Sequence, residues 1–210
     1  MKVPGPLEAW ETDYRKRGRV WGGTAQNLPD IPPGSRVLEL GCGNGKTFAA
    51  LLERGCDTVG IDFSRNAVVL CSRSFGTSSQ SHVVVAEAQN LPFADGSFDA
   101  VVAYHVAGHL DSCGRIDLSR EAQRAVHPGG NLWFSGFSVG DFRAAKGTVS
   151  EPGTVVKKNG IATHYFTKDE VIRLFSGFSC QDCGMHRWYL TVRGRNFLRE
   201  EIIARFTKNG

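Results

Sequence analysis

Short apolar runs alternate with amphipathic segments through the first half of the chain. Four of the runs have the length of a strand: residues 37–40, 58–62, 83–86 and 98–104. Between them lie two segments with apolar side chains at helical spacing, residues 47–54 and 65–75. This alternation predicts an α/β fold around a mostly parallel sheet. The run at 83–86 is apolar throughout, so we expect a strand that is buried on both faces.

The chain after residue 110 predicts a helix, a turn and a strand, and then becomes irregular. We expect the helix at 117–126, a tight turn at 127–130 (His-Pro-Gly-Gly) and the strand at 131–135. Residues 136–162 follow no period and predict a substrate-facing insertion, with a small hairpin.

The last part of the chain predicts one capped helix followed by three further elements. Thr167 and Glu170 form a capping box at the start of that helix. Two terminal strands are expected at 178–186 and 188–192. Residues 196–207 are expected to be helical, because apolar side chains recur there at a spacing of four.

Composition narrows the class of protein. A chain of 210 residues with 41% hydrophobic and 22% charged residues predicts one globular domain. The net charge of +4 permits an anionic substrate, RNA included, without favouring one. Six cysteines in this length indicate reduced thiols, so we expect a cytoplasmic protein. The chain has no run of 18 apolar residues and no signal-peptide pattern, so no membrane span is expected.

A glycine-rich turn joins the first strand to the first helix, and three ligand classes use such turns. A phosphate-binding P-loop ends in Gly-Lys-Thr, as at 45–47, but it needs one more residue between its glycines. The dinucleotide pattern needs a glycine where Lys46 stands. The third class has the pattern Glu-x-Gly-x-Gly-x-Gly, which the turn matches in full with Glu39, Gly41, Gly43 and Gly45.

Two acidic positions after the turn bear on the choice of ligand. Asp62 ends the second strand, where its carboxylate can accept both ribose hydroxyls of a nucleoside. Proteins that bind nicotinamide dinucleotides have an acid at the same position, so Asp62 does not distinguish between the ligand classes. The stretch from Glu87 to Asp99 reads Glu-Ala-Gln-Asn-Leu-Pro-Phe-Ala-Asp-Gly-Ser-Phe-Asp, and dinucleotide dehydrogenases have no such element.

Four elements in order resemble the class I S-adenosylmethionine (SAM)-dependent methyltransferases: the glycine turn, Asp62, residues 87–99 and the Pro-Gly-Gly turn. The resemblance spans residues 36–178. It is to the methyltransferase type 11 or UbiE-like group and the tRNA wobble-uridine methyltransferase-like group. It implies a Rossmann-like seven-stranded, mostly parallel sheet with an antiparallel last strand and helices on both faces. It also implies SAM as cofactor and S-adenosylhomocysteine as product.

The resemblance also implies the cofactor-binding residues. Phe63 would lie on the adenine, and Glu87, where the family usually has Asp, would accept from the adenine amino group. Tyr104 would line the pocket near the methyl group, because it ends the fourth strand. The expected set is Glu39, Gly41, Cys42, Gly43, Gly45, Asp62, Phe63, Glu87, Ala88, Tyr104, Tyr14 and Trp21.

Residues 1–34 precede the methyltransferase domain, which we place at 35–210. Trp10, Tyr14 and Trp21 lie here in a polar setting. One reading is a helix that packs two aromatic residues on the edge of the core. The other, which the resemblance favours for Tyr14 and Trp21, is a lid that covers the methionine end of SAM and excludes water.

Two histidines follow the fourth strand. His105 is the candidate catalytic residue: it either lines the pocket or acts as a general base. His109 is expected to anchor the loop by hydrogen bonds. The cations Lys157, Lys158 and Arg199 are expected to be solvated.

The acceptor is left open, as a small molecule or a tRNA base. No metal site is expected, because Cys180 and Cys183 form only one of the two pairs that zinc usually needs. By family resemblance, a small zinc-binding activator subunit is a candidate partner. A SAM-binding but non-catalytic or partner-activated subunit of a heterodimer is an alternative function, and a NAD-dependent oxidoreductase is a distant third.

Overall fold

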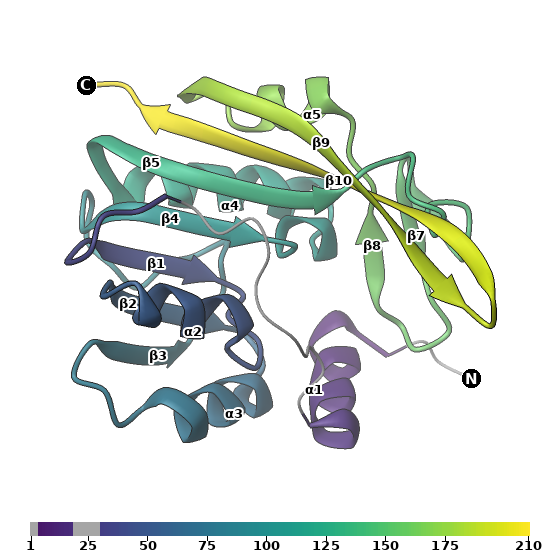
Figure 1. Ribbon diagram of the computed structural model, residues 1–210, viewed down its shortest axis with the longest axis horizontal. Helices are drawn as coiled ribbons and strands as arrows, with labels where there is room; N and C mark the ends of the chain where they lie inside the picture. The colour runs from purple at the N-terminus through teal and green to yellow at the C-terminus, as the bar shows by residue number, and fades with distance from the viewer. Residues whose placement is uncertain (1–3, 19–29) are drawn as a thin grey trace.

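Strands and helices alternate through the first half of the chain, as the apolar runs predict (Figure 1). The computed structural model describes residues 4–18 and 30–210. The first elements are α1 (Pro6–Arg17), β1 (Arg36–Leu40), α2 (Lys46–Glu53), β2 (Asp57–Asp62), α3 (Arg65–Phe75), β3 (Ser81–Val85) and β4 (Phe98–Tyr104). The later elements are the 3₁₀ helix η1 (Ala107–His109), α4 (Ser112–Ala125), β5 (Val126–Phe137), β6 (Thr148–Glu151), β7 (Thr154–Val156), β8 (Ala162–His164), α5 (Lys168–Leu174), β9 (Phe178–Val192) and β10 (Arg195–Lys208).

In the described part of the chain, seven strands form one sheet in the order β3-β2-β1-β4-β5-β10-β9. Strands β3, β2, β1, β4 and β5 pair in parallel. Strand β10 runs antiparallel to both of its neighbours, β5 and β9. The predicted Rossmann-like sheet with an antiparallel last strand is therefore confirmed.

Helices cover both faces of the sheet, because alternate residues of a strand point to opposite sides. On β1, Leu38 faces a core that α4 and α5 close, through Leu118 and Val171. Its neighbour Val37 packs against Leu51 of α2 on the other face. Helix α3 packs beside α2 on that face. No described helix combines the length and apolar character that crossing a membrane requires.

Strand β3 lies at the edge of the sheet, so the expectation that it is buried on both faces is wrong. It pairs with β2 alone, and Val84 and Val85 are 37% and 48% exposed. An apolar run identifies a strand but does not give its place in the sheet. The outer side of β3 has no partner strand in the described part of the chain, so its backbone groups can pair with another strand.

The Pro-Gly-Gly segment is part of β5 rather than a turn before it. Val126 pairs with Phe98, and the next pair joins Asn131 to Ala100, so β5 accommodates extra residues as a bulge. A side chain at Gly130 would place a Cβ 2.7 Å from the Asp99 carbonyl oxygen. The bulge therefore requires glycine at this position.

The expected helix at 196–207 is wrong, because these residues form β10. A spacing of four is even, so Leu198, Ile202 and Phe206 lie on one face of a strand as well as one face of a helix. These residues pair with β5 on one side and with β9 on the other, so they form a strand. The two strands expected at 178–192 are one continuous strand, β9.

Capping side chains fix the starts of two helices. Glu170 N donates to Thr167 Oγ1 at 3.2 Å, which confirms the predicted cap of α5. Helix α4 begins earlier than the predicted residue 117. Asp111 caps it there by accepting from Gly114 N at 2.8 Å.

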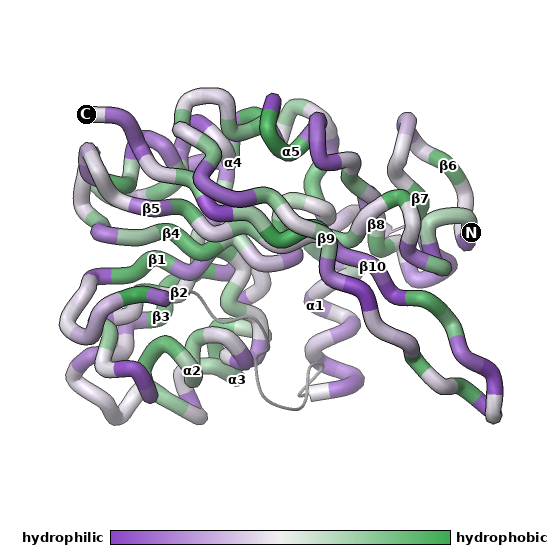
Figure 2. Tube along the Cα trace, turned by 45° about the horizontal axis from the view of Figure 1, so that its top comes forward, coloured by the Kyte–Doolittle hydropathy of each residue, from purple (hydrophilic) through white to green (hydrophobic). Residues whose placement is uncertain are grey.

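The irregular stretch at 136–162 contains more structure than one hairpin. Strands β6, β7 and β8 form a separate antiparallel sheet. Figures 1 and 2 place it beside the β9–β10 hairpin, which projects from the body of the molecule. Figure 2 shows hydrophobic residues along the central strands and mixed stretches along that hairpin.

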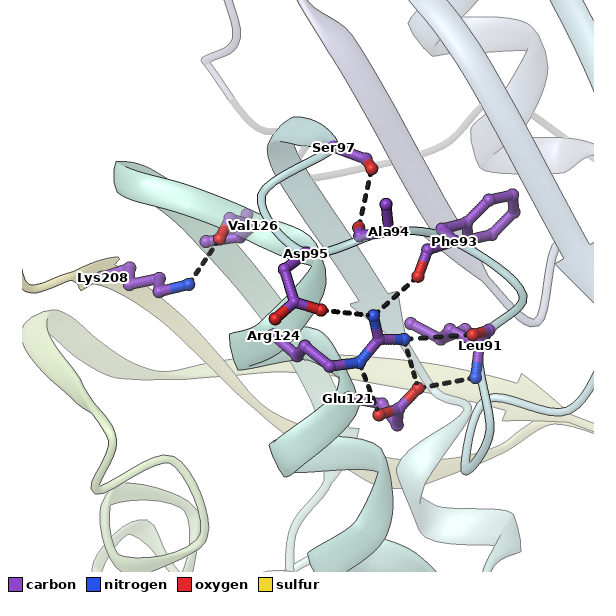
Figure 3. A network of polar contacts seen from close by, with 9 residues as sticks. All are labelled: Leu91, Phe93, Ala94, Asp95, Ser97, Glu121, Arg124, Val126 and Lys208. Carbon is purple, nitrogen blue, oxygen red and sulfur yellow. Dashed lines mark hydrogen bonds and ion pairs between the residues drawn. The ribbon is translucent and has the colours of Figure 1, made fainter.

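Arg124 of α4 holds the segment that follows β3 (Figure 3). Its Nη1 donates to the Phe93 carbonyl at 2.6 Å and to Asp95 Oδ1 at 2.8 Å, and its Nη2 donates to the Leu91 carbonyl at 3.0 Å. Glu121 accepts from the same guanidinium and from Leu91 N. Arg124 thereby fixes the path of the chain just after residues 87–90.

Replacing Arg124 tests this clamp. Arg124→Ala removes the donor to two carbonyls and to Asp95 and leaves Glu121 with the Leu91 N–H alone, so we expect the free energy of unfolding to fall by about 1.5–3 kcal/mol. Arg120→Ala is the matched control on the same helix, because Arg120 is exposed and, among the described residues, pairs with Asp117 alone. It should change the value by less than about 0.5 kcal/mol in urea unfolding. Equal effects of the two substitutions would contradict the clamp.

Candidate functional site

A cavity of about 990 Å³ opens at the carboxyl ends of β1, β2 and β4. This edge of an open α/β sheet is where ligands bind. Helix α1, the region around β7 and β8, and strand β10 complete its walls. The cavity is lined by most of the predicted site residues: Tyr14, Glu39, Gly41, Cys42, Gly43, Asp62, Phe63, Glu87, Ala88, Tyr104 and His105.

Two predicted site residues are not among them. Gly45 is the N-cap of α2 with a φ of 85°, and a Cβ there would lie 2.5 Å from Phe75 Cε2. The absence of a side chain at Gly45 lets the turn pack closely against α3. Trp21 lies outside the described residues.

The glycine turn brings backbone to the cavity wall. Gly41 has a φ of 72°, and a Cβ there would lie 3.0 Å from Val106. Cys42 N donates to the Ile61 carbonyl at 2.8 Å, which ties the turn to the end of β2. The turn therefore has little freedom to adopt another path.

Asp62 at the end of β2 is buried and holds two backbone segments together. Its Oδ2 accepts from Gly43 N at 3.0 Å, and its Oδ1 accepts from Ser64 N at 2.9 Å. Burial raises the pKa of Asp62 to about 6, against the effect of these two hydrogen bonds. Ser64 caps α3 by accepting from Ala67 N at 3.2 Å, which is the structural role its sequence position indicates.

Glu39 of β1 is a buried carboxylic acid that lines the cavity. Its Oε2 has no hydrogen-bond partner among the described residues. Burial, with smaller contributions from Cys71 and Asp62, raises the pKa of Glu39 well above its usual range. An unsatisfied buried acid is costly, so Glu39 is suited to a ligand that brings a cationic donor.

Helix α1 covers the cavity with aromatic side chains. Trp10 and Tyr14 are buried and pack in one cluster with Ala67 of α3 and with Ile161. The Trp10 ring also meets the His109 ring, with centroids 4.9 Å apart.

His109 anchors its loop, as the sequence predicts. Its Nδ1 donates to the Ala162 carbonyl at 2.7 Å. Burial lowers the pKa of His109 to about 4, so the ring is neutral at pH 7. The bond ties the loop after β4 to β8.

His105 follows β4, which lies on the other side of β1 from the strand β2 that carries Asp62, and it belongs to a network that β10 completes. Its Nε2 lies 3.1 Å from Glu201 Oε2, and Ser135 Oγ donates to the same oxygen at 3.0 Å. His186 Nδ1 lies 3.0 Å from Glu201 Oε1. The Nδ1 of His105 has no partner in the described residues.

Glu201 is ionised at neutral pH. Burial by itself would raise its pKa, but the hydrogen bonds from His105, His186 and Ser135 outweigh burial and lower it to about 2. A carboxylate can only accept, so the Nε2 of His105 carries the proton that it donates. The neutral His105 ring then has its lone pair on Nδ1.

The backbone of His105 is unusual for a non-glycine residue. Its φ is 57°, in the left-handed region. The His105 N–H donates to the Ser135 carbonyl at 2.7 Å, which holds the residue in this conformation. Such conformations gather at functional sites.

The residues that β10 contributes to the cavity were not predicted from the sequence. The cavity is lined by Arg199, Glu201 and Ile203, which stand at alternate positions. Alternate residues of a strand share one face, so this spacing would have grouped them if the segment had been predicted as a strand. Arg199, expected to be solvated, is 7% exposed. A helical reading of the segment would have scattered these side chains over different faces.

Comparison with known proteins places this geometry in a family. A family model described as a methyltransferase domain matches residues 38–134. The demethylmenaquinone methyltransferase of Corynebacterium urealyticum is 34% identical over 58% of this chain and 50% of its own length. The tRNA (carboxymethyluridine(34)-5-O)-methyltransferase of Arabidopsis thaliana is 35% identical over 52% of this chain and 26% of its own length. The chain thus spans half or less of the length of these relatives.

Solved structures share the whole fold at low identity. A SAM-dependent methyltransferase from Methanosarcina mazei has a TM-score of 0.71 at 22% identity, covering 85% of this chain and 94% of that one. A complex between the Haloferax volcanii Trm112 methyltransferase activator and a methyltransferase contains a chain with a TM-score of 0.72 at 18% identity, with both chains covered in full. Residues 38–134 thus match a methyltransferase domain, and the chain has the fold of the SAM-dependent methyltransferases, whose cofactor is S-adenosylmethionine.

Proposed function

We propose that this chain transfers a methyl group from SAM to an acceptor bound beside His105. The observation that carries the proposal is the cavity itself. One end has the glycine turn, Asp62 and Glu39, and the other end has His105 with its lone pair unpartnered. A cofactor held at the first end would present its reacting group toward the second.

The residues at the first end fit SAM. Asp62 is buried at the strand end with lone pairs beyond its two backbone bonds, so it can accept the ribose hydroxyls. Glu39 has an oxygen without a donor, which the methionine ammonium group would supply. Glu87 and Ala88 offer an acceptor and an N–H for the adenine edge, and Phe63 and Tyr14 line the same cavity.

Catalysis in this proposal is mainly positioning. When bound, SAM supplies an activated methyl group on a sulfonium. The cavity aligns the acceptor with that group, and the aromatic cover of α1 keeps water out. If the acceptor is protonated at neutral pH, its proton passes to the Nδ1 of His105. Glu201 is then a positioning residue, because it fixes the tautomer of that ring.

The acceptor is a small molecule or a tRNA base in this proposal. The printed names of two relatives, which act on demethylmenaquinone and on a tRNA uridine, support these two classes.

An alternative is a chain that binds SAM but needs a partner for turnover. The similarity to the methyltransferase crystallised with the Trm112 activator favours it, and so does the exposed edge of β3, where a partner strand can add to the sheet.

A transfer screen tests the function. The chain is incubated with tritiated SAM and with cell extract separated into RNA, protein and small-molecule fractions. We expect label in the RNA or the small-molecule fraction. Turnover that appears only when a small zinc-binding activator subunit is added would favour the partner-activated alternative. Tight binding of NAD with no binding of SAM would overturn both.

The pKa of Asp62 predicts how cofactor affinity depends on pH. Ribose hydroxyls donate to the ionised carboxylate, so binding favours that form. Affinity for S-adenosylhomocysteine should therefore be highest above about pH 7 and fall by up to about tenfold per unit as the pH drops through 6. Asp62→Asn should weaken binding and remove the part of this dependence that lies near pH 6 in calorimetry.

The matched control is Asp57→Asn, at the exposed opposite end of the same strand. It should leave both the affinity and its pH dependence unchanged. A wild-type affinity that does not vary between about pH 5 and 8 would remove the assignment of Asp62 to the ribose.

His105 and Glu201 predict a graded loss of turnover with the acceptor that the screen identifies. His105→Ala should lower kcat roughly 10²–10⁴-fold. Glu201→Gln should lower it less, because it removes the negative charge and replaces one accepting oxygen by an NH2 donor but keeps the base. S-adenosylhomocysteine affinity should not change in either variant. His82→Ala, on the exposed β3 edge, is the control. An unchanged kcat in His105→Ala would show that no base is used there.

A further inference from the structure

The cavity has a cationic wall that methyl transfer by itself does not need. Arg199 of β10, Arg143 between β5 and β6, and Lys157 just after β7 all line it. These three side chains come from three separate segments, so the fold rather than local sequence brings them together. Arg199 is buried, Arg143 is half-buried and Lys157 is exposed.

Arg199 is held by one acid and has donor capacity left over. Its Nε donates to Asp141 Oδ2 at 2.6 Å. Its Nη2 is buried and has no hydrogen-bond partner in residues 4–18 and 30–210. A buried guanidinium with an unused donor is costly unless a ligand satisfies it.

Asp141 does not have spare capacity for the other two cations. Its Oδ1 accepts from Arg143 N at 2.9 Å, and its Oδ2 accepts from Glu200 N at 3.2 Å as well as from Arg199. The acid is therefore used to hold backbone and Arg199 in place. It neutralises one positive charge of the three.

Arg143 and Lys157 have no carboxylate oxygen within 4.0 Å among the described residues. Partial burial, followed by the neighbouring charge of Arg199, lowers the pKa of Arg143. Although the residue as a whole is exposed, desolvation of its ammonium group, followed by the charges of Arg143 and Arg199, lowers the pKa of Lys157. The three cations repel one another, so an anion placed among them would relieve a repulsion that the free protein carries.

Aromatic rings join this wall to the proposed base. The Phe137 ring lies 4.6 Å from the His105 ring, and the Arg199 guanidinium carbon lies 4.3 Å from the same Phe137 ring. Trp188 stacks near Arg199 at 5.3 Å, and Tyr165 lies beside Phe137. Phe137, Tyr165 and Trp188 all line the cavity, so they offer ring surfaces to a planar ligand. The Phe137 ring lies between His105 and Arg199.

We propose that the acceptor is a small aromatic acid, whose carboxylate binds Arg143, Lys157 and Arg199 and whose hydroxyl group lies at His105. The inference rests on the proposed methyl transfer and names its substrate class. A small acid suits the place of these cations inside the cavity, under α1 and the β7–β8 region. A nucleic-acid backbone would call for a cationic stripe over the outer surface instead.

The test compares acids with their neutral amides. Binding of benzoate and 4-hydroxybenzoate, and of benzamide and 4-hydroxybenzamide, is measured by calorimetry on the full chain, with and without saturating S-adenosylhomocysteine. We expect each acid to bind at least about tenfold more tightly than its amide. Arg143→Gln/Lys157→Gln leaves Arg199 alone and should remove most of this preference. Lys158→Gln, a neighbouring lysine outside the cavity lining, should retain it.

Each other outcome overturns the assignment. Acids that bind no more tightly than their amides, or a preference that the double variant leaves unchanged, would show that these cations do not select the acceptor. Tighter binding of inorganic phosphate than of either acid would reassign the wall to a phosphate group. Binding of an RNA oligonucleotide without binding of the acids would exclude a small acceptor.

The cofactor site serves as an independent readout. The double variant should keep wild-type affinity for S-adenosylhomocysteine, which also shows that it is folded. Failure of the wild type to bind S-adenosylhomocysteine would refute the proposed function alone, because the preference for acid over amide is measured without it as well.

Discussion

The buried carboxylate of Asp62 is the constraint on which the cofactor end of the cavity depends. It joins Gly43 of the glycine turn to Ser64 at the start of α3, so the ends of β1 and β2 cannot separate. Holding an acid with a pKa of about 6 in a buried place costs free energy at neutral pH. A ligand with two hydroxyl donors would offset that cost, which links the stability of the strand ends to the function we propose.

The opposite end of the cavity depends on β10, which is inserted antiparallel between β5 and β9. Its alternating residues carry Arg199 and Glu201 to the cavity wall, where they meet Phe137 and His105. One strand thus supplies both the acid that orients the proposed base and the cation that we assign to the acceptor. The residues that we assign to the cofactor lie at the ends of parallel strands, whereas Arg199 and Glu201, which we assign to the acceptor side, lie on the antiparallel strand β10.

The sequence predicted the cavity residues near the glycine turn better than those on β10 for a physical reason. The glycine turn, Asp62 and the segment at 87–99 are local patterns, in which neighbouring residues fix the backbone. Glu201 meets His105 only through pairing of strands far apart in the chain. Apolar residues at a spacing of four fit both a helix and a strand, so β10 was misread and Glu201 was missed. Likewise, an apolar run did not reveal that Val84 and Val85 lie at a sheet edge.

A crystal structure of the chain with S-adenosylhomocysteine tests the central claim most directly. We expect ribose hydroxyls within hydrogen-bond distance of the Asp62 carboxylate, the amino group near Glu39, and the sulfur directed toward His105. A ligand bound outside this cavity, or one whose adenine rather than its sulfur faces His105, would contradict it.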